Sequence, residues 1–168
     1  MTATAPPGDT QVVIYGEDVE RMNRQLDAFL NLSSAKAVLL VDRTGRVVTR
    51  RGQDLRVDFE TFGVLAAGSF AATRELARLV GEDQFSCLTH QGARHHIHLA
   101  RVDDRTLFVV LFDERTTLGM VRLYAGETAR RLVTLLEETR TRRRSPPEEL
   151  DAGFGTSAKG AVDKLLGG

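Results

Sequence analysis

Hydrophobic residues recur along this chain at helical and strand periods, and the two periods predict separate elements. From Gly16 onward the hydrophobic positions are spaced so that they fall on one face of a helix. We therefore expect a first helix over 17–32. Its hydrophobic positions are Val19, Met22, Leu26, Phe29 and Leu30.

A β-hairpin is expected next. The segment 35–42 is dense in aliphatic and β-branched residues, as strands are. A turn with Gly45 near its end follows over 43–46, and Val47–Arg51 supplies the returning strand.

A second helix is predicted over 58–80, with Gly81 as its C-terminal stop. Its hydrophobic positions, among them Leu65, Leu76 and Leu79, keep helical spacing. Each glycine inside a helix costs about 1 kcal/mol relative to alanine, so the small residues in its middle suggest that another backbone comes close there. These small residues are Gly63, Ala66, Ala67, Gly68, Ser69, Ala71, Ala72 and Thr73.

Three strands are predicted over 85–90, 95–102 and 106–112, separated by two turn-like segments. The last strand, Leu-Phe-Val-Val-Leu-Phe, is apolar on both faces. A strand of this kind is usually covered on both sides, so we expect it at the centre of the sheet.

A third helix should begin at a cap formed by Thr116 or Thr117 and run to about Thr139. Together the elements follow the order helix, two strands, helix, three strands, helix. The inner face of this last helix comprises Leu118, Val121, Ala125, Leu132, Leu135 and Leu136.

The ends of the chain differ in composition from its middle. Residues 1–11 are predicted to form a flexible N-terminus, and 141–150 a linker rich in arginine and proline. The arginines of 140–144 are compatible with an acidic or phosphate-bearing partner and equally with a solvated helix end. Residues 151–168 have apolar residues at helical spacing, but isolated helices below about 12–15 residues are marginal in water. We expect this tail to fold onto a partner.

Length and charge narrow the class of protein. The 168 residues correspond to one domain with a short remainder. Because 23 basic and 23 acidic residues cancel, no overall field favours nucleic acid. No apolar stretch approaches the roughly 20 residues that span a bilayer, and the first residues lack the features of a secretory signal. We expect a cytoplasmic protein without membrane insertion.

Candidate chemistry is sparse. The four histidines, His90, His95, His96 and His98, lie close together, and His96 and His98 share one face of a strand. A third metal ligand is missing, which favours surface or strand-edge histidines with ordinary titration. A histidine-bound metal hydrolase would require stoichiometric metal. The single cysteine, Cys87, would meet His90 only if the backbone folded back, and it is more typical of a small buried hydrophobic residue.

The chain resembles the bacterial Roadblock/dynein light-chain family and, within it, the MglB-type regulators of polarity and motility. The resemblance covers about 12–140, and the terminal Leu-Leu-Gly also looks like the family's tail. It rests on the strings Val41-Asp-Arg-Thr-Gly45, Ala66-Ala-Gly-Ser-Phe-Ala-Ala72, Leu79-Val-Gly-Glu82, His90-Gln-Gly92 and Leu111-Phe-Asp-Glu-Arg-Thr-Thr-Leu-Gly119.

This resemblance implies an α/β (α+β) Roadblock-type sandwich around an antiparallel five-stranded sheet, with the Roadblock domain over 12–140. It also implies a homodimer in which two sheets join and the second helices pair. Such a dimer binds an MglA-like small GTPase in a 2:1 complex and accelerates GTP hydrolysis by moving the GTPase's own arginine and glutamine into place. The chain would then have no active site or cofactor of its own, and GTP or GDP with Mg²⁺ would belong to the partner.

Two groups of residues match the family's GTPase-binding surfaces. On the second helix, Arg74 and Glu75 depart from the small residues that the family places there. The helix-two group is Ala67, Ala71, Arg74, Glu75 and Arg78. The tail group, which in the family assists nucleotide exchange, is Phe154, Val162, Leu165 and Leu166.

A second function remains open, because a Roadblock scaffold could hold proteins together without changing hydrolysis. The resemblance also implies a cytoplasmic protein that can concentrate at a cell pole.

Overall fold

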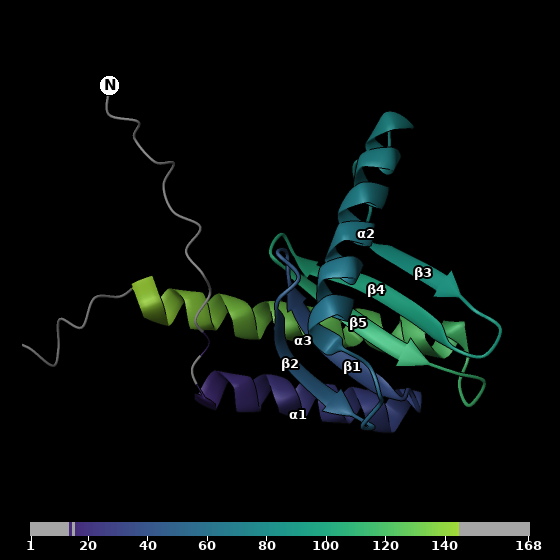
Figure 1. The fold of residues 1–168 in the computed structure, drawn as a ribbon. Coiled ribbons are helices and arrows are strands. Elements are labelled where there is room, and N and C mark those ends of the chain that lie inside the picture. The colour runs from purple at the N-terminus through teal and green to yellow at the C-terminus, as the bar shows by residue number, and fades with distance from the viewer. Residues whose placement is uncertain (1–13, 15, 145–168) are drawn as a thin grey trace, which may run out of the picture. The chain divides into compact units, whose positions relative to one another are not determined.

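The computed structural model describes residue 14 and residues 16–144. Its centre is a five-stranded antiparallel sheet in the order β2-β1-β5-β4-β3. Helix α2 covers one face, and α1 and the first part of α3 cover the other (Figure 1). The sheet and its helices form a compact unit that ends at Leu135, inside α3. The elements are α1 (Gly16–Ser33), β1 (Ala37–Asp42), β2 (Val47–Gly52), α2 (Phe59–Leu79), β3 (Cys87–Gln91), β4 (His96–Asp103), β5 (Thr106–Phe112) and α3 (Leu118–Arg144).

The predicted order of elements is confirmed, and so is the position of the last strand. β5 lies between β1 and β4, with Val38 opposite Val110 on one side and His98 opposite the same residue on the other. Because successive side chains of a strand point to opposite faces, Val109 faces α2 while Phe108 faces α1. Both are fully buried, which accounts for the apolar run.

Each face of the sheet has its own core. On the α2 side, Ala66, Ala67 and Phe70 pack against Leu39, Val109 and neighbouring strand residues. On the opposite side, the rings of Phe29 and Phe108 meet edge to face with centroids 5.0 Å apart. Residues buried on that side also include Met22, Leu26, Val121, Ala125 and Leu132.

Helix α3 differs from the prediction at its C-terminal end. Its start agrees, because the Thr117 hydroxyl accepts a hydrogen bond from the Met120 backbone N–H at 3.2 Å. It continues to Arg144, however, so the predicted end near Thr139 is too early, and residues 141–144 of the predicted linker are helical. Arginine is a good helix former, and the first residue that opposes a helix is Pro146, which disfavours helical backbone at the residue before it. The remainder of the predicted linker, 145–150, lies outside the described residues.

Candidate partner-binding surface

Helix α2 begins at a well-defined cap. The Asp58 carboxylate accepts hydrogen bonds from the backbone N–H groups of Glu60 and Thr61 at 3.1 and 3.2 Å, and from the Thr61 hydroxyl at 2.6 Å. These bonds, led by that of the Thr61 hydroxyl, lower the pKa of Asp58. The Arg50 guanidinium lies 4.2 Å from the centre of the Phe59 ring. The first turn of α2 is therefore attached to β2.

The inner face of α2 contains the close backbone approach that its small residues predict. A Cβ added to Gly63 would lie 2.4 Å from the carbonyl oxygen of Gly45, in the β1–β2 turn. Gly68 is different, because a Cβ there would meet nothing within 4 Å. Further along, Phe70 packs on Phe85 with ring centroids 5.0 Å apart. The predicted close approach is therefore confirmed at Gly63 and is not found at Gly68.

The outer face of α2 is apolar and exposed. Leu65 is 65% exposed, Leu76 62% and Leu79 83%. A contiguous patch of large exposed apolar side chains is typical of a site that binds another protein. We call the group Val64, Leu65, Gly68, Ala72, Leu76 and Leu79 the outer α2 surface.

The helical spacing of these leucines is visible in the sequence, and their exposure has a sequence signal as well. Apolar residues are distributed around much of the helix. When a helix has apolar residues beyond the side that faces its own core, the additional apolar side is expected to pack against something else. The spacing alone does not say which leucines face the sheet.

Four of the five residues predicted to bind the GTPase on this helix are at least partly exposed, and one is buried. Ala71, Glu75 and Arg78 are exposed, and Arg74 is half-buried. The Arg78 guanidinium lies 2.8 Å from the Glu75 carboxylate. Ala67 departs from the expectation: it is only 6% exposed and packs against the sheet, so its side chain is not available to a partner. Ala71 lies one turn later on nearly the same side of the helix, where α2 extends past the sheet (Figure 1) and leaves it exposed.

A second unpartnered feature is the outer edge of β3. β3 pairs with β4 on one side, and no strand within residues 16–144 pairs with it on the other. Backbone bonds from Arg101 N–H to the Ser86 carbonyl and from Gly92 N–H to the His95 carbonyl, at 2.8 and 3.1 Å, define which residues face β4. By alternation, the backbone groups of Cys87, Thr89 and Gln91 point to the open edge. An open edge of this kind is a template for another strand.

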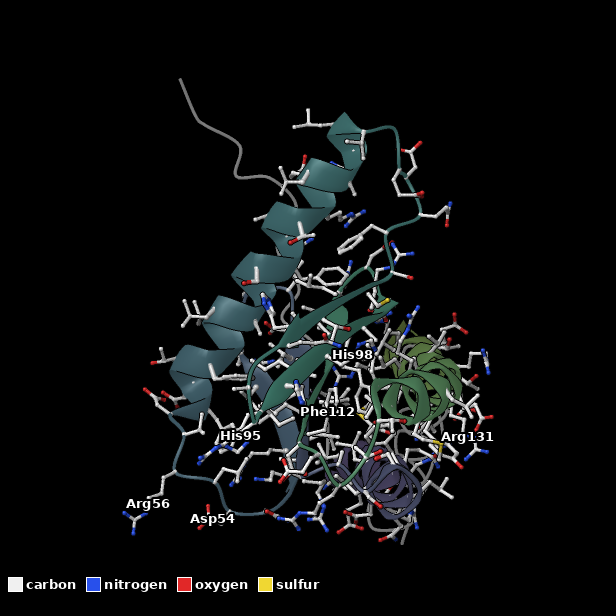
Figure 2. The ribbon with its side chains drawn as sticks, turned by 90° about the vertical axis from the view of Figure 1, so that its right-hand side faces the viewer. Asp54, Arg56, His95, His98, Phe112 and Arg131 are labelled. Carbon is white, nitrogen blue, oxygen red and sulfur yellow. The ribbon has the colours of Figure 1, made fainter. Side chains whose placement is uncertain are left out.

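The outer α2 surface and the β3 edge adjoin each other. α2 contacts β3 directly, and the C-terminal half of α2 extends past the sheet beside β3 (Figures 1 and 2). The chain therefore presents one apolar helix face and one unpaired strand in the same region, a combination that suits protein–protein association.

The histidines do not form a metal site in the part of the chain that the structure describes, since no group of three or more His, Cys, Asp or Glu side chains there could hold an ion. The expectation of ordinary titration is wrong for His98. This side chain is 2% exposed, and its Nδ1 lies 2.8 Å from the Thr89 hydroxyl. Burial, with a smaller effect of the Arg122 charge, lowers the pKa of His98 to about 4. His98 is therefore neutral at pH 7.

Cys87 and His90 belong to the same strand and are three positions apart, so their side chains point to opposite faces. The pairing that a cysteine nucleophile would need is not formed. Among the described residues, no helix has the length and apolar character needed to cross a bilayer.

The sequence matches the Roadblock/LC7 domain over residues 22–112, more than half of the chain. The chain belongs to the Roadblock/LC7 family. The match begins inside α1 and ends with β5, so it contains the whole sheet and α2. The comparison with curated protein sequences gives no match.

Solved structures of Roadblock proteins named MglB resemble this chain in both sequence and fold. The gliding protein MglB of Thermus thermophilus is 33% identical, with a TM-score of 0.71 over 75% of this chain and 96% of that one. MglB of Myxococcus xanthus is 35% identical, with a TM-score of 0.67 over 70% of this chain and 96% of that one. An MglB in a tetrameric arrangement is 33% identical, with a TM-score of 0.72 over 76% and 96%.

The predicted tail residues Phe154, Val162, Leu165 and Leu166 lie outside the described residues.

Proposed function

We propose that this Roadblock protein is a homodimeric regulator of an MglA-type small GTPase and that it accelerates GTP hydrolysis by that GTPase. The observation that carries the proposal is the outer α2 surface, in a chain similar to MglB proteins over most of their length. Its exposed leucines form an apolar face that has no partner within the described chain. A regulator whose activity depends on docking requires such a face.

The open edge of β3 supports the homodimer in this proposal. Two copies that pair along β3 bury both open edges and bring two α2 helices to the same face of a continuous sheet, because α2 contacts β3. The GTPase then docks across the paired helices. Gly68 and Ala72 leave room for another backbone at this surface, since a Cβ on Gly68 meets nothing in the single chain.

The regulator acts by positioning residues of the GTPase and inserts no arginine of its own. On α2 the candidate arginines are Arg74, which is half-buried, and Arg78, which is bound to Glu75. An inserted arginine finger contributes about 10³–10⁵ to GTP hydrolysis. Arg74→Ala combined with Arg78→Ala should therefore lower stimulated hydrolysis by less than about tenfold, whereas loss of a finger would cost about a thousandfold or more.

The deciding experiment measures single-turnover GTP hydrolysis by an MglA-type GTPase at increasing concentrations of this protein. We expect faster hydrolysis that saturates. Ala71→Arg places a long charged side chain on exposed α2 and should abolish the effect while the dimer stays folded. Asn31→Arg, on an exposed position of α1, is the matched control and should keep full stimulation.

Two outcomes would overturn the activation proposal. Tight binding without faster hydrolysis would instead establish a scaffold, the second function that the sequence left open. Full stimulation by Ala71→Arg would show that the GTPase docks elsewhere.

The C-terminal residues 151–168 supply a second contact in this proposal, through Phe154, Val162, Leu165 and Leu166. The support is their helical spacing in the sequence. A peptide tethered to the dimer samples the GTPase at high effective concentration. Truncation after Pro147 should weaken GTPase affinity and slow assisted nucleotide release, and saturating truncated protein should still stimulate hydrolysis. Unchanged affinity and exchange would remove the tail from the proposal.

A further inference from the structure

A groove of about 340 Å³ lies between the sheet and α3, on the side of the sheet opposite to α2. Figure 2 shows His98 on this side, facing α3. The groove lies on the other side of the sheet from the outer α2 surface and reaches as far as β3, because Ser86 and Cys87 are among its lining residues. The lining residues that matter for its chemistry are His98, Ala100, Val102, Arg122, Gly126 and Arg130.

Two arginines of α3, Arg122 and Arg130, give the groove a positive charge. Arg122 and Arg130 are exposed on α3, and among the described residues neither guanidinium forms an ion pair. Arg101 also borders the groove, but it pairs with Leu107 of the core on the α2 side. Its side chain therefore lies on that side of the sheet, where its guanidinium is 3.5 Å from the exposed Asp104 carboxylate. None of the described residues that line the groove is acidic. The arginine charge is therefore left largely uncompensated.

The floor of the groove is neutral and has small side chains. Ala100 and Val102 are buried on β4, and His98, which precedes them on the same face of this strand, is uncharged at pH 7. Across from them, a Cβ added to Gly126 would meet nothing within 4 Å. An aliphatic side chain can therefore enter between the arginines.

We propose that this groove binds an acidic segment of a partner protein, with carboxylates on Arg122 and Arg130 and an aliphatic side chain on the floor. Charge complementarity selects the partner, because guanidinium groups pair with carboxylates through two parallel hydrogen bonds. The apolar floor favours a peptide over a free inorganic anion. Since the groove and α2 lie on opposite faces of the sheet, the acidic segment and the GTPase can bind together.

The test uses the full chain and a fluorescein-labelled peptide in which glutamates alternate with leucines. Fluorescence anisotropy should show saturable binding that weakens as salt is raised. Salt screens the attraction between exposed charges, and the screening distance falls to about 10 Å at 0.1 M salt. The same peptide with glutamine in place of glutamate should not bind.

Three variants locate the site. Arg122→Glu combined with Arg130→Glu should weaken peptide binding at least about tenfold, since each charge-assisted contact alone is worth that factor. Arg131→Glu is the matched control: it lies on the same helix, is exposed and does not line the groove, and should change binding little. Gly126→Leu should also block binding, because a Cβ at this position meets no atom within 4 Å and the rest of the leucine side chain would take up space in the groove.

Several results would overturn the proposal. An equal loss from Arg131→Glu would mean that any basic charge on α3 suffices, and unchanged binding by Gly126→Leu would place the peptide outside the groove. Inorganic phosphate that binds while the peptide does not would establish a simple anion site. Because none of these measurements includes the GTPase, they are independent of the proposed function.

Discussion

The backbones of Gly45 and Gly63 lie directly against each other, so that a Cβ on Gly63 would come within 2.4 Å of the Gly45 carbonyl oxygen. Gly45 has a φ of +95°, a conformation that glycine adopts without strain. The contact seats the β1–β2 turn on α2 and thereby fixes where α2 crosses the sheet. The position of the outer α2 surface depends on it.

Gly63→Ala should destabilise the domain. Alanine improves helix propensity by about 1 kcal/mol, but the added methyl must displace backbone, and overpacking of this kind costs about 1–3 kcal/mol or more. The measurement is urea unfolding. Gly126→Ala is the control, because its methyl meets nothing and should raise the free energy of unfolding. If Gly63→Ala is as stable as Gly126→Ala, the close approach is wrong.

His98 should make the domain sensitive to mild acid. Its pKa is about 4 when folded, against 6.5 ordinarily, so the unfolded chain binds the extra proton between these values. Stability is therefore lost as pH falls through this window, by about 2 kcal/mol between pH 7 and 5.

The free energy of unfolding, measured against pH, tests this contribution. His98→Gln can retain a hydrogen bond to Thr89 without titrating and should flatten the pH dependence. His95→Gln, at an exposed position, should leave the dependence as it is. Equal slopes for the parent and His98→Gln would contradict the assignment.

The β3 edge should be required for dimerisation. Cys87→Pro combined with Gln91→Pro removes two backbone N–H groups that point away from β4, and edge strands tolerate proline at such positions. Light scattering should then show a shift from dimer to monomer. Cys87→Ser combined with Gln91→Ser keeps both N–H groups and should leave the dimer mass unchanged. A stable dimer of the proline variant would exclude this edge as the interface.

Leu76→Ser combined with Leu79→Ser should weaken GTPase binding at least about tenfold, as the loss of two apolar anchors does. Both leucines are largely exposed, so the free energy of unfolding of the single chain should change by less than about 1 kcal/mol. Leu32→Ser is the control, because Leu32 is a leucine of similar exposure on α1. Titration calorimetry with the GTPase distinguishes the variants. Equal affinities for all would remove the outer α2 surface from the proposal.

Much of the fold follows from local signals in the sequence. The period of hydrophobic residues located α1 and α2, and Gly81, with its φ of +82°, ends α2 where a left-handed residue is needed. The apolar run of 106–112 placed β5 at the centre of the sheet. These features depend on near neighbours in the chain, and near neighbours are what a sequence displays.

Tertiary structure decided which side of each helix and strand is buried and which side stays exposed to a partner. The sequence by itself indicated that a backbone approaches the small residues of α2, but only packing against the β1–β2 turn selected Gly63 and left Gly68 open. Packing also buried Ala67 and His98 while exposing Leu76. The groove joins β4 to α3, whose residues are separated in the chain, so no local pattern could reveal it. The burial of a side chain and the charge around it depend on residues that are far apart in the sequence, and folding is what brings these residues together.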